Sequence, residues 1–164
     1  VFRYSNTSVR TMEIAANLLK FGFDFSGLIE KTFYEKTYVQ TQIMGRAILE
    51  SIRFMNNKCI VSVVTRRMMD FYQVGPKDLD GIVNQLQGVK GVECAIFMYE
   101  IGTLSYKVSM RSNGLVDVAG VAVKFGGGGH LRAAGCTMNG TCHDNINNLS
   151  REIASQLKKA QEQV

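Results

Sequence analysis

A run of four glycines followed by a histidine is the part of this 164-residue sequence whose residue types could do chemistry. Because glycine has no Cβ, its backbone N–H groups can come close to a ligand, and successive N–H groups can form an anion-binding concavity. A histidine and an arginine beside such donors would complete a cradle for a phosphate or a carboxylate. A tight turn or a hinge is the alternative explanation of the glycines. The residues concerned are Gly126, Gly127, Gly128, Gly129, His130 and Arg132.

A second candidate group, Arg111 and Ser112, ends a segment of alternating apolar and polar residues. An arginine and a hydroxyl at the end of a strand, next to a turn, are well placed to meet an anion at the edge of a sheet. A turn with a surface arginine explains the same residues equally well. The spacing alone therefore leaves both interpretations open.

Other residue types that could do chemistry form no clear pattern. Cys136, Cys142 and His143 lack a CxxC pair and a fourth ligand, so the sequence predicts no zinc site. No arrangement of serine, histidine and aspartate indicates a nucleophilic enzyme. The pair Met68 and Met69 is expected in the core.

The elements that would position these residues divide the sequence into two parts. Apolar residues recur at helical spacing up to Gly22, again after Asp24 and a third time over residues 39–54, and Ser5 to Ser8 offer caps for the first helix. Asn56 and Asn57 then break the pattern. We therefore expect residues 1–55 to be a helical extension without a strand.

From residue 56 onward, strands and helices alternate. Strands are expected at 59–64, 92–99, 104–110 and 133–138, because these segments are β-branched, apolar or alternating. Helices are expected at 76–86 and 116–125 and from residue 144 to the end. The alternation predicts an α/β domain at 56–164 with a mixed β-sheet and flanking helices.

Composition narrows the class of protein. Nineteen basic and fourteen acidic residues give a net charge of +5, which permits an anionic ligand and suits a short substrate better than a long duplex. No apolar run reaches the roughly 18 residues of a membrane span, so no membrane association is expected. The four cysteines are irregularly spaced, which favours reduced thiols and a cytoplasmic location.

Taken together, these motifs resemble the DHH-associated C-terminal domain of DHH-family phosphoesterases. The sequence is most similar to the subfamily of oligoribonucleases, or nanoRNases, that also dephosphorylate phosphoadenosine phosphate and are called exopolyphosphatase-related. The similar segments are Met110-Arg111-Ser112, Asp117-Val118, Phe125 to His130, Ala133-Ala134-Gly135, Gly81 to Asn84, Lys90 to Glu93 and the opening segment Phe2 to Thr7. The resemblance covers essentially the whole chain.

The resemblance implies a function and a role for each site residue. In this family an N-terminal DHH domain binds two divalent metal ions, usually Mn²⁺, and a bridging water attacks the phosphodiester. Carried over, Arg111 and Ser112 lie at the substrate phosphate and the four glycines form its backbone cradle. His130 is the catalytic residue at the scissile-phosphate end, and Arg132 is a further substrate contact.

The sequence contains no Asp-His-His triplet, so we expect the metal ligands to lie upstream. The resemblance implies that residues 1–55 are the helical end of the DHH catalytic domain and its linker, that residues 56–164 are the DHH-associated substrate-binding domain, and that this piece binds substrate without hydrolysing it. Its partners would be short single-stranded RNA or nucleotide phosphates such as 3′-phosphoadenosine 5′-phosphate. The sequence leaves the oligomeric state undecided, and a homodimer is one possibility. Two alternatives remain: a cyclic-dinucleotide phosphodiesterase, and a noncatalytic nucleic-acid-binding module of a tRNA-editing protein.

Overall fold

The computed structural model describes residues 7–161, which fall into two compact units that meet between Thr37 and Tyr38. The first unit contains helix α1 (Val9–Leu19), helix α2 (Phe25–Ile29) and the π-helix η1 (Glu30–Tyr34). These confirm the first two expected helices. Of the expected capping residues, Ser8 caps α1 through its hydroxyl, whereas Ser5 and Asn6 lie outside the described residues. The opening segment that resembles the phosphoesterases also lies outside them, except for Thr7.

The first unit has no hydrophobic core among its described residues. None of the residues in its three helices is buried, and the apolar side chain of Phe21 is 83% exposed. Apolar side chains contribute to stability only when they leave water.

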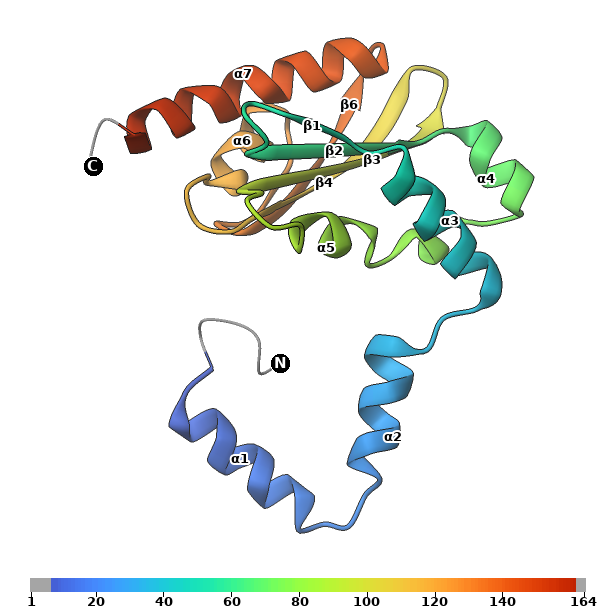
Figure 1. Cartoon of the computed structure of the whole chain (residues 1–164), viewed down its shortest axis with the longest axis vertical. Helices are drawn as coiled ribbons and strands as arrows, with labels where there is room; N and C mark the ends of the chain where they lie inside the picture. The colour runs from blue at the N-terminus through green and yellow to red at the C-terminus, as the bar shows by residue number, and fades with distance from the viewer. Residues whose placement is uncertain (1–6, 162–164) are drawn as a thin grey trace. The chain divides into compact units, whose positions relative to one another are not determined.

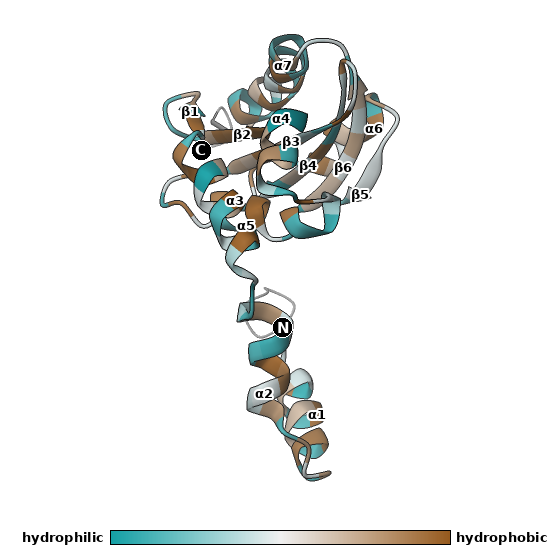
Figure 2. Ribbon diagram, turned by 90° about the vertical axis from the view of Figure 1, so that its right-hand side faces the viewer, coloured by the Kyte–Doolittle hydropathy of each residue, from teal (hydrophilic) through white to brown (hydrophobic). Residues whose placement is uncertain are grey.

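The second unit is built on one six-stranded sheet, in which the strands lie side by side in the order β1-β2-β3-β4-β6-β5 (Figure 2). Strands β2 and β3 are parallel, and every other neighbouring pair is antiparallel. This confirms the predicted mixed sheet. The strands are β1 (Ile52–Phe54), β2 (Cys59–Val64), β3 (Cys94–Gly102), β4 (Ser105–Ser112), β5 (Gly128–His130) and β6 (Ala133–Asn139).

Helices cover the sheet on both faces, as predicted (Figure 1). On one face, α6 (Val118–Lys124) and α7 (Cys142–Gln161) pack against side chains from β2, β3, β4 and β6. On the other face lie α3 (Tyr38–Leu49), α4 (Arg66–Tyr72), the 3-10 helix η2 (Pro76–Leu79) and α5 (Ile82–Gln87). The sheet residues of this second core come from β2 and β3 alone.

The second face of the sheet is therefore only half covered. Beyond α5, the side chains that β4 and β6 direct to this face are half-buried or exposed. Lys107 and Thr137 are exposed there, and Ser109 is half-buried. We call the part of this face over β4, β6 and β5 the open face.

Several boundaries differ from the expectations. The third helix ends at Leu49 and not at residue 54, because Ile52–Phe54 pairs with β2 as strand β1. The expectation of no strand before residue 55 was therefore wrong. Asn56 and Asn57 have positive φ and form the β1–β2 turn. The predicted domain boundary lies between residues 55 and 56, whereas α3 and β1 belong to the second unit.

Helix α4 and strand β5 were not predicted either, and the expected helix at 76–86 is split by Gly81, whose φ is +90°. Met69 is buried, and Met68 packs against the same core, as expected. Within residues 7–161, no helix is long and apolar enough to cross a membrane.

Candidate functional site

Arg111 and His130 lie in one row across the open face. Arg111 of β4 is paired with Ala133 of β6, and Ala133 is in turn paired with His130 of β5. Directly paired residues of antiparallel strands direct their side chains to the same face. Neighbouring strands are about 4.8 Å apart, so the backbones of Arg111 and His130 are separated by about 10 Å, with only a methyl group between them. The structure thus places the arginine of one sequence motif and the histidine of the other in one row on the same face of the sheet.

The guanidinium of Arg111 is held by two neutral acceptors. Its Nε donates to Oδ1 of Asn84 at 3.2 Å, and its Nη1 donates to the backbone oxygen of Met110 at 3.0 Å. No ion pair joins it to an acidic side chain of residues 7–161. Two of the five N–H groups of the guanidinium are therefore used, and its positive charge remains available to an anion.

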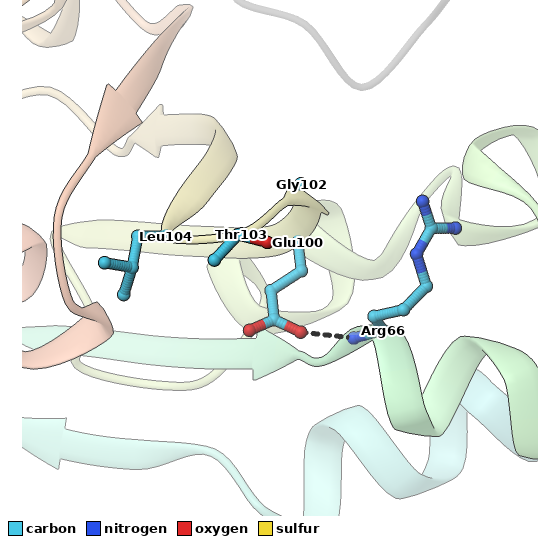
Figure 3. Close-up of a pocket in the computed structure, with 5 residues that line it drawn as sticks. All are labelled: Arg66, Glu100, Gly102, Thr103 and Leu104. Carbon is cyan, nitrogen blue, oxygen red and sulfur yellow. Dashed lines mark hydrogen bonds between the residues drawn. The ribbon is translucent and has the colours of Figure 1, made fainter.

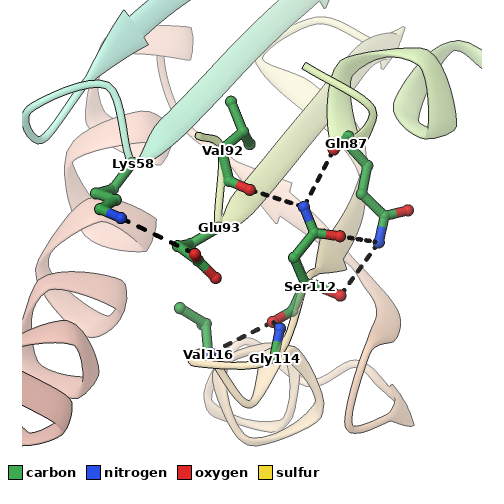
Figure 4. Close-up of polar contacts among 8 residues, drawn as sticks. Lys58, Gln87, Val92, Glu93, Ser112, Gly114 and Val116 are labelled. Atoms are coloured by element: carbon green, nitrogen blue, oxygen red, sulfur yellow. Dashed lines mark hydrogen bonds and ion pairs between the residues drawn. The ribbon is translucent and has the colours of Figure 1, made fainter. Parts of the chain in front are cut away.

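A network of amide hydrogen bonds fixes the end of β4 just after Arg111. Nε2 of Gln87 donates to the backbone oxygen of Ser112 at 3.1 Å and to Oδ1 of Asn113 at 3.2 Å (Figure 4). Nδ2 of Asn113 donates in return to the backbone oxygens of Gln87, at 3.1 Å, and Val92, at 2.7 Å. Helix α5 is thereby tied to the strand end that carries the candidate arginine.

The four glycines serve the fold in different ways. Gly126 has a φ of +71° and ends helix α6, with its N–H bonded to the oxygen of Val123. Gly127 and Gly129 are so close to β6 that a Cβ at either position would collide with it, whereas a Cβ at Gly128 would meet nothing within 4 Å. The glycines are thus a helix end and an edge strand, and not a free loop.

Strand β5 still leaves backbone groups available for a ligand. Within residues 7–161 it is the last strand of the sheet, and its one strand partner there is β6. An edge strand presents unpaired N–H and C=O groups on its outer side. His130, at the end of this strand, is exposed.

Ser112 and Arg132 do not join the row on the open face. Ser112 is fully buried on the opposite face, where its hydroxyl accepts the N–H groups of Gly114 at 3.1 Å and Val116 at 3.3 Å (Figure 4). Arg132 is exposed in the turn between β5 and β6, near Gly114. Ser112 shapes the turn after Arg111, and Arg132 lies at the margin of the site.

The other chemically suggestive groups form no second site. No three His, Cys, Asp or Glu side chains of the described residues are grouped so that they could hold a metal ion. A shallow hollow is lined by residues that include Arg66 and Leu104 (Figure 3). It lies at the turn of the β3–β4 hairpin, whereas Arg111 pairs with Ala95 near the other end. The carboxylate of the hollow, Glu100, accepts the backbone N–H of Arg66 and the hydroxyl of Tyr106, so it serves as a structural link.

Sequence reasoning missed the two residues of α5 that serve the site. Asn84 and Gln87 are three positions apart, so they lie on one side of the helix, and both contact the end of β4. Asn84 belongs to a segment that resembles the phosphoesterase subfamily, but its contact with Arg111 joins residues 27 positions apart. Only the packing of α5 against β4 reveals it.

The sequence is similar to that of the bifunctional oligoribonuclease and PAP phosphatase NrnA from several bacteria. It is 30% identical to the Thermus thermophilus protein over 140 residues, which are 85% of this chain and 41% of that protein. It is 23% identical to the Bacillus subtilis protein over 137 residues, which are 84% of this chain and 42% of that protein. The chain thus spans about two fifths of the length of these relatives.

The fold is similar to that of a solved exopolyphosphatase-related protein from Bacteroides fragilis. The TM-score is 0.86 at 23% identity, over 94% of this chain and 45% of that one. Residues 56–159 match the DHHA1 domain family, a segment that includes β2 to β6, the Arg111–His130 row and most of α7. The chain therefore belongs to the DHHA1 domain family.

Proposed function

We propose that this chain is the substrate-binding part of a phosphoesterase that hydrolyses short oligoribonucleotides, 3′-phosphoadenosine 5′-phosphate or both. The observation that carries the proposal is the row of Arg111, Ala133 and His130 on the open face. It places an arginine and a histidine on one face of the sheet, with backbones about 10 Å apart and only the methyl group of Ala133 on the strand between them. The similarity to NrnA-type oligoribonucleases and PAP phosphatases supports this choice of substrates.

In this proposal, each residue of the row acts on the phosphate. Arg111 donates paired N–H groups to two phosphate oxygens, for which the planar guanidinium is suited. His130 lies at the scissile phosphate and exchanges a proton there or donates a hydrogen bond. The outer edge of β5 at Gly128–Gly129 adds one backbone N–H donor, because the N–H groups of neighbouring strand residues point to opposite sides, and Arg132 approaches the substrate from the β5–β6 turn.

Hydrolysis itself requires groups that the described residues do not supply. The side chains of residues 7–161 do not fit a metal site, so no reaction step through a metal is assigned to them. We propose that two divalent ions, Mn²⁺ in the first instance, are bound by a part of the protein outside these residues. The greater length of the NrnA relatives supports this view. The cytoplasmic location and a homodimer stay predictions of the sequence.

Calorimetric titration of the 164-residue chain tests the proposal. The ligands are 3′-phosphoadenosine 5′-phosphate, a diribonucleotide with a 5′-phosphate, and adenosine as the control without phosphate. We expect binding of both phosphorylated ligands that weakens with added salt, and no binding of adenosine. The same chain with Mn²⁺ should show no phosphodiesterase turnover. Equal affinity for adenosine, or robust turnover, would refute the proposal.

A further inference from the structure

We infer that Asn84 is a positioning residue that aims the guanidinium of Arg111 at the substrate phosphate. The inference rests on the proposed function and deepens it. Asn84 lies one helical turn before Gln87, whose amide bonds tie α5 to the end of β4. The helix is thus anchored to the strand at the point where Asn84 reaches Arg111.

The two contacts of Arg111 determine which side of its guanidinium is available. Asn84 accepts from Nε, and the oxygen of Met110 accepts from Nη1. A guanidinium binds two phosphate oxygens either through Nε and one Nη or through both Nη atoms. Because Nε is occupied, the first mode is closed. The second mode remains, through Nη2 and the N–H of Nη1 that does not bond to Met110. Asn84 therefore selects the end-on approach of the phosphate.

The chemistry of the amide suits this role. A carboxylate at the same position would also accept from Nε, but it would cancel much of the positive charge that attracts the phosphate. The neutral oxygen of Asn84 orients the guanidinium and leaves its charge intact. The hydrogen bond also restricts the conformations of the flexible Arg111 side chain before the ligand binds, which lowers the entropic cost of binding.

The orientation is tested without ligand by NMR of the arginine Nε–H group. Hydrogen bonding slows the exchange of an N–H proton with water. We expect a slowly exchanging Nε–H signal from Arg111 in the wild-type chain, lost in Asn84→Ala and kept in Asn84→Asp. Gln85→Ala is the matched control, because Gln85 is an exposed neighbour on the same helix. A signal that is unchanged in Asn84→Ala would overturn the inference.

The consequence is tested by the affinity for 3′-phosphoadenosine 5′-phosphate. We expect Asn84→Ala to raise the Kd about 5- to 10-fold and Asn84→Asp to raise it further, with Gln85→Ala unchanged. In an Arg111→Ala background, Asn84→Ala should change the Kd less than about twofold, because its effect acts through the arginine. Equal effects of Asn84→Ala in both backgrounds would contradict a positioning role.

The two proposals fail in distinguishable ways. If the wild-type chain does not bind the nucleotide but Asn84→Ala releases the Nε–H of Arg111, the proposed function fails and the positioning of the guanidinium stands. If the wild-type chain binds and Arg111→Ala weakens binding while Asn84→Ala changes neither readout, the proposed function stands. The inference about Asn84 is then wrong.

Discussion

Gly127 and Gly128 are adjacent in the chain but have opposite steric surroundings. A Cβ at Gly127 would lie 2.2 Å from the backbone oxygen of Gly135 and 2.5 Å from Cβ of Cys136. A Cβ at Gly128 would meet no heavy atom within 4 Å, and Gly128 has no positive φ. The fold therefore explains the glycine at 127, whereas the glycine at 128 has no steric reason within the described residues.

Alanine substitutions should separate these two glycines. Gly127→Ala should lower the free energy of unfolding by more than about 2 kcal/mol, because the collision is with backbone that cannot move aside. Gly128→Ala should change it by less than about 1 kcal/mol but weaken nucleotide binding, since the methyl group would stand where the ligand approaches the strand. Urea denaturation and calorimetric titration measure the two effects. If Gly128→Ala leaves the affinity for the nucleotide unchanged, β5 is not part of the binding site.

Filling the space between Arg111 and His130 should block the site. Ala133→Leu places a large side chain in the row on the open face and should weaken binding of 3′-phosphoadenosine 5′-phosphate at least about 10-fold. Thr137→Leu is the matched control, because Thr137 lies on the same strand and face but outside the row. Similar losses in both variants would mean that the row has no special role.

The residues of the row should matter for binding and not for folding. If the proposed function is right, Arg111→Ala and His130→Ala, each placed in the full-length protein, should lower phosphoesterase activity while the Tm stays nearly unchanged. Both side chains lie at the surface of the sheet and neither belongs to the hydrophobic cores. Activity on short RNA and thermal melting measure the two properties. A fall in Tm of many degrees would assign the residue a structural role.

Ser112 should show the opposite behaviour. Ser112→Ala removes the hydroxyl that accepts the N–H groups of Gly114 and Val116, so the free energy of unfolding should fall by about 1–2 kcal/mol. Ser109→Ala, on the open face, is the control and should leave stability unchanged. Urea denaturation distinguishes them. If Ser112→Ala weakens nucleotide binding but leaves the free energy of unfolding unchanged, the hydroxyl of Ser112 contacts the substrate phosphate and the structural role is wrong.

Alkaline pH should destabilise the second unit through its buried thiols. Burial, aided by the negative charge of Glu93, raises the pKa of Cys59 from its ordinary value of 9.0 to about 12. The folded protein therefore keeps a proton that the unfolded chain loses, and this contribution to stability is complete below about pH 9 and falls as the pH rises toward 12. The loss is at most about 1.4 kcal/mol per pH unit for one thiol.

Urea denaturation from pH 8 to 11 measures this dependence. The free energy of unfolding should fall less steeply with pH in Cys59→Ala than in the wild-type chain. The difference between the two curves isolates the thiol from the lysines and tyrosines that also titrate in this range. Parallel curves would show that Cys59 does not contribute.

Local sequence patterns were sufficient for the long elements of the second unit. Strand β2 is a nearly continuous run of apolar, mostly β-branched residues, which predicts a strand buried on both faces. Helix α7 has an apolar stripe at helical spacing, which predicts an amphipathic helix. Strand β1 escaped prediction because its three residues continue the helical spacing of α3. Its partner, β2, follows only after the turn at Asn56 and Asn57, and this pairing decides its conformation.

The sequence by itself determined which residues could bind an anion, because the glycine run, His130 and Arg111 are recognisable by type. The tertiary structure alone decided how they are combined. The pairing of β4, β6 and β5 puts Arg111 and His130 on one face, and the alternation of side chains turns Ser112 away from it. Asn84 reaches Arg111 only because α5 packs beside β4. Side-chain facing and long-range contacts depend on strand register and helix packing, which no local pattern encodes.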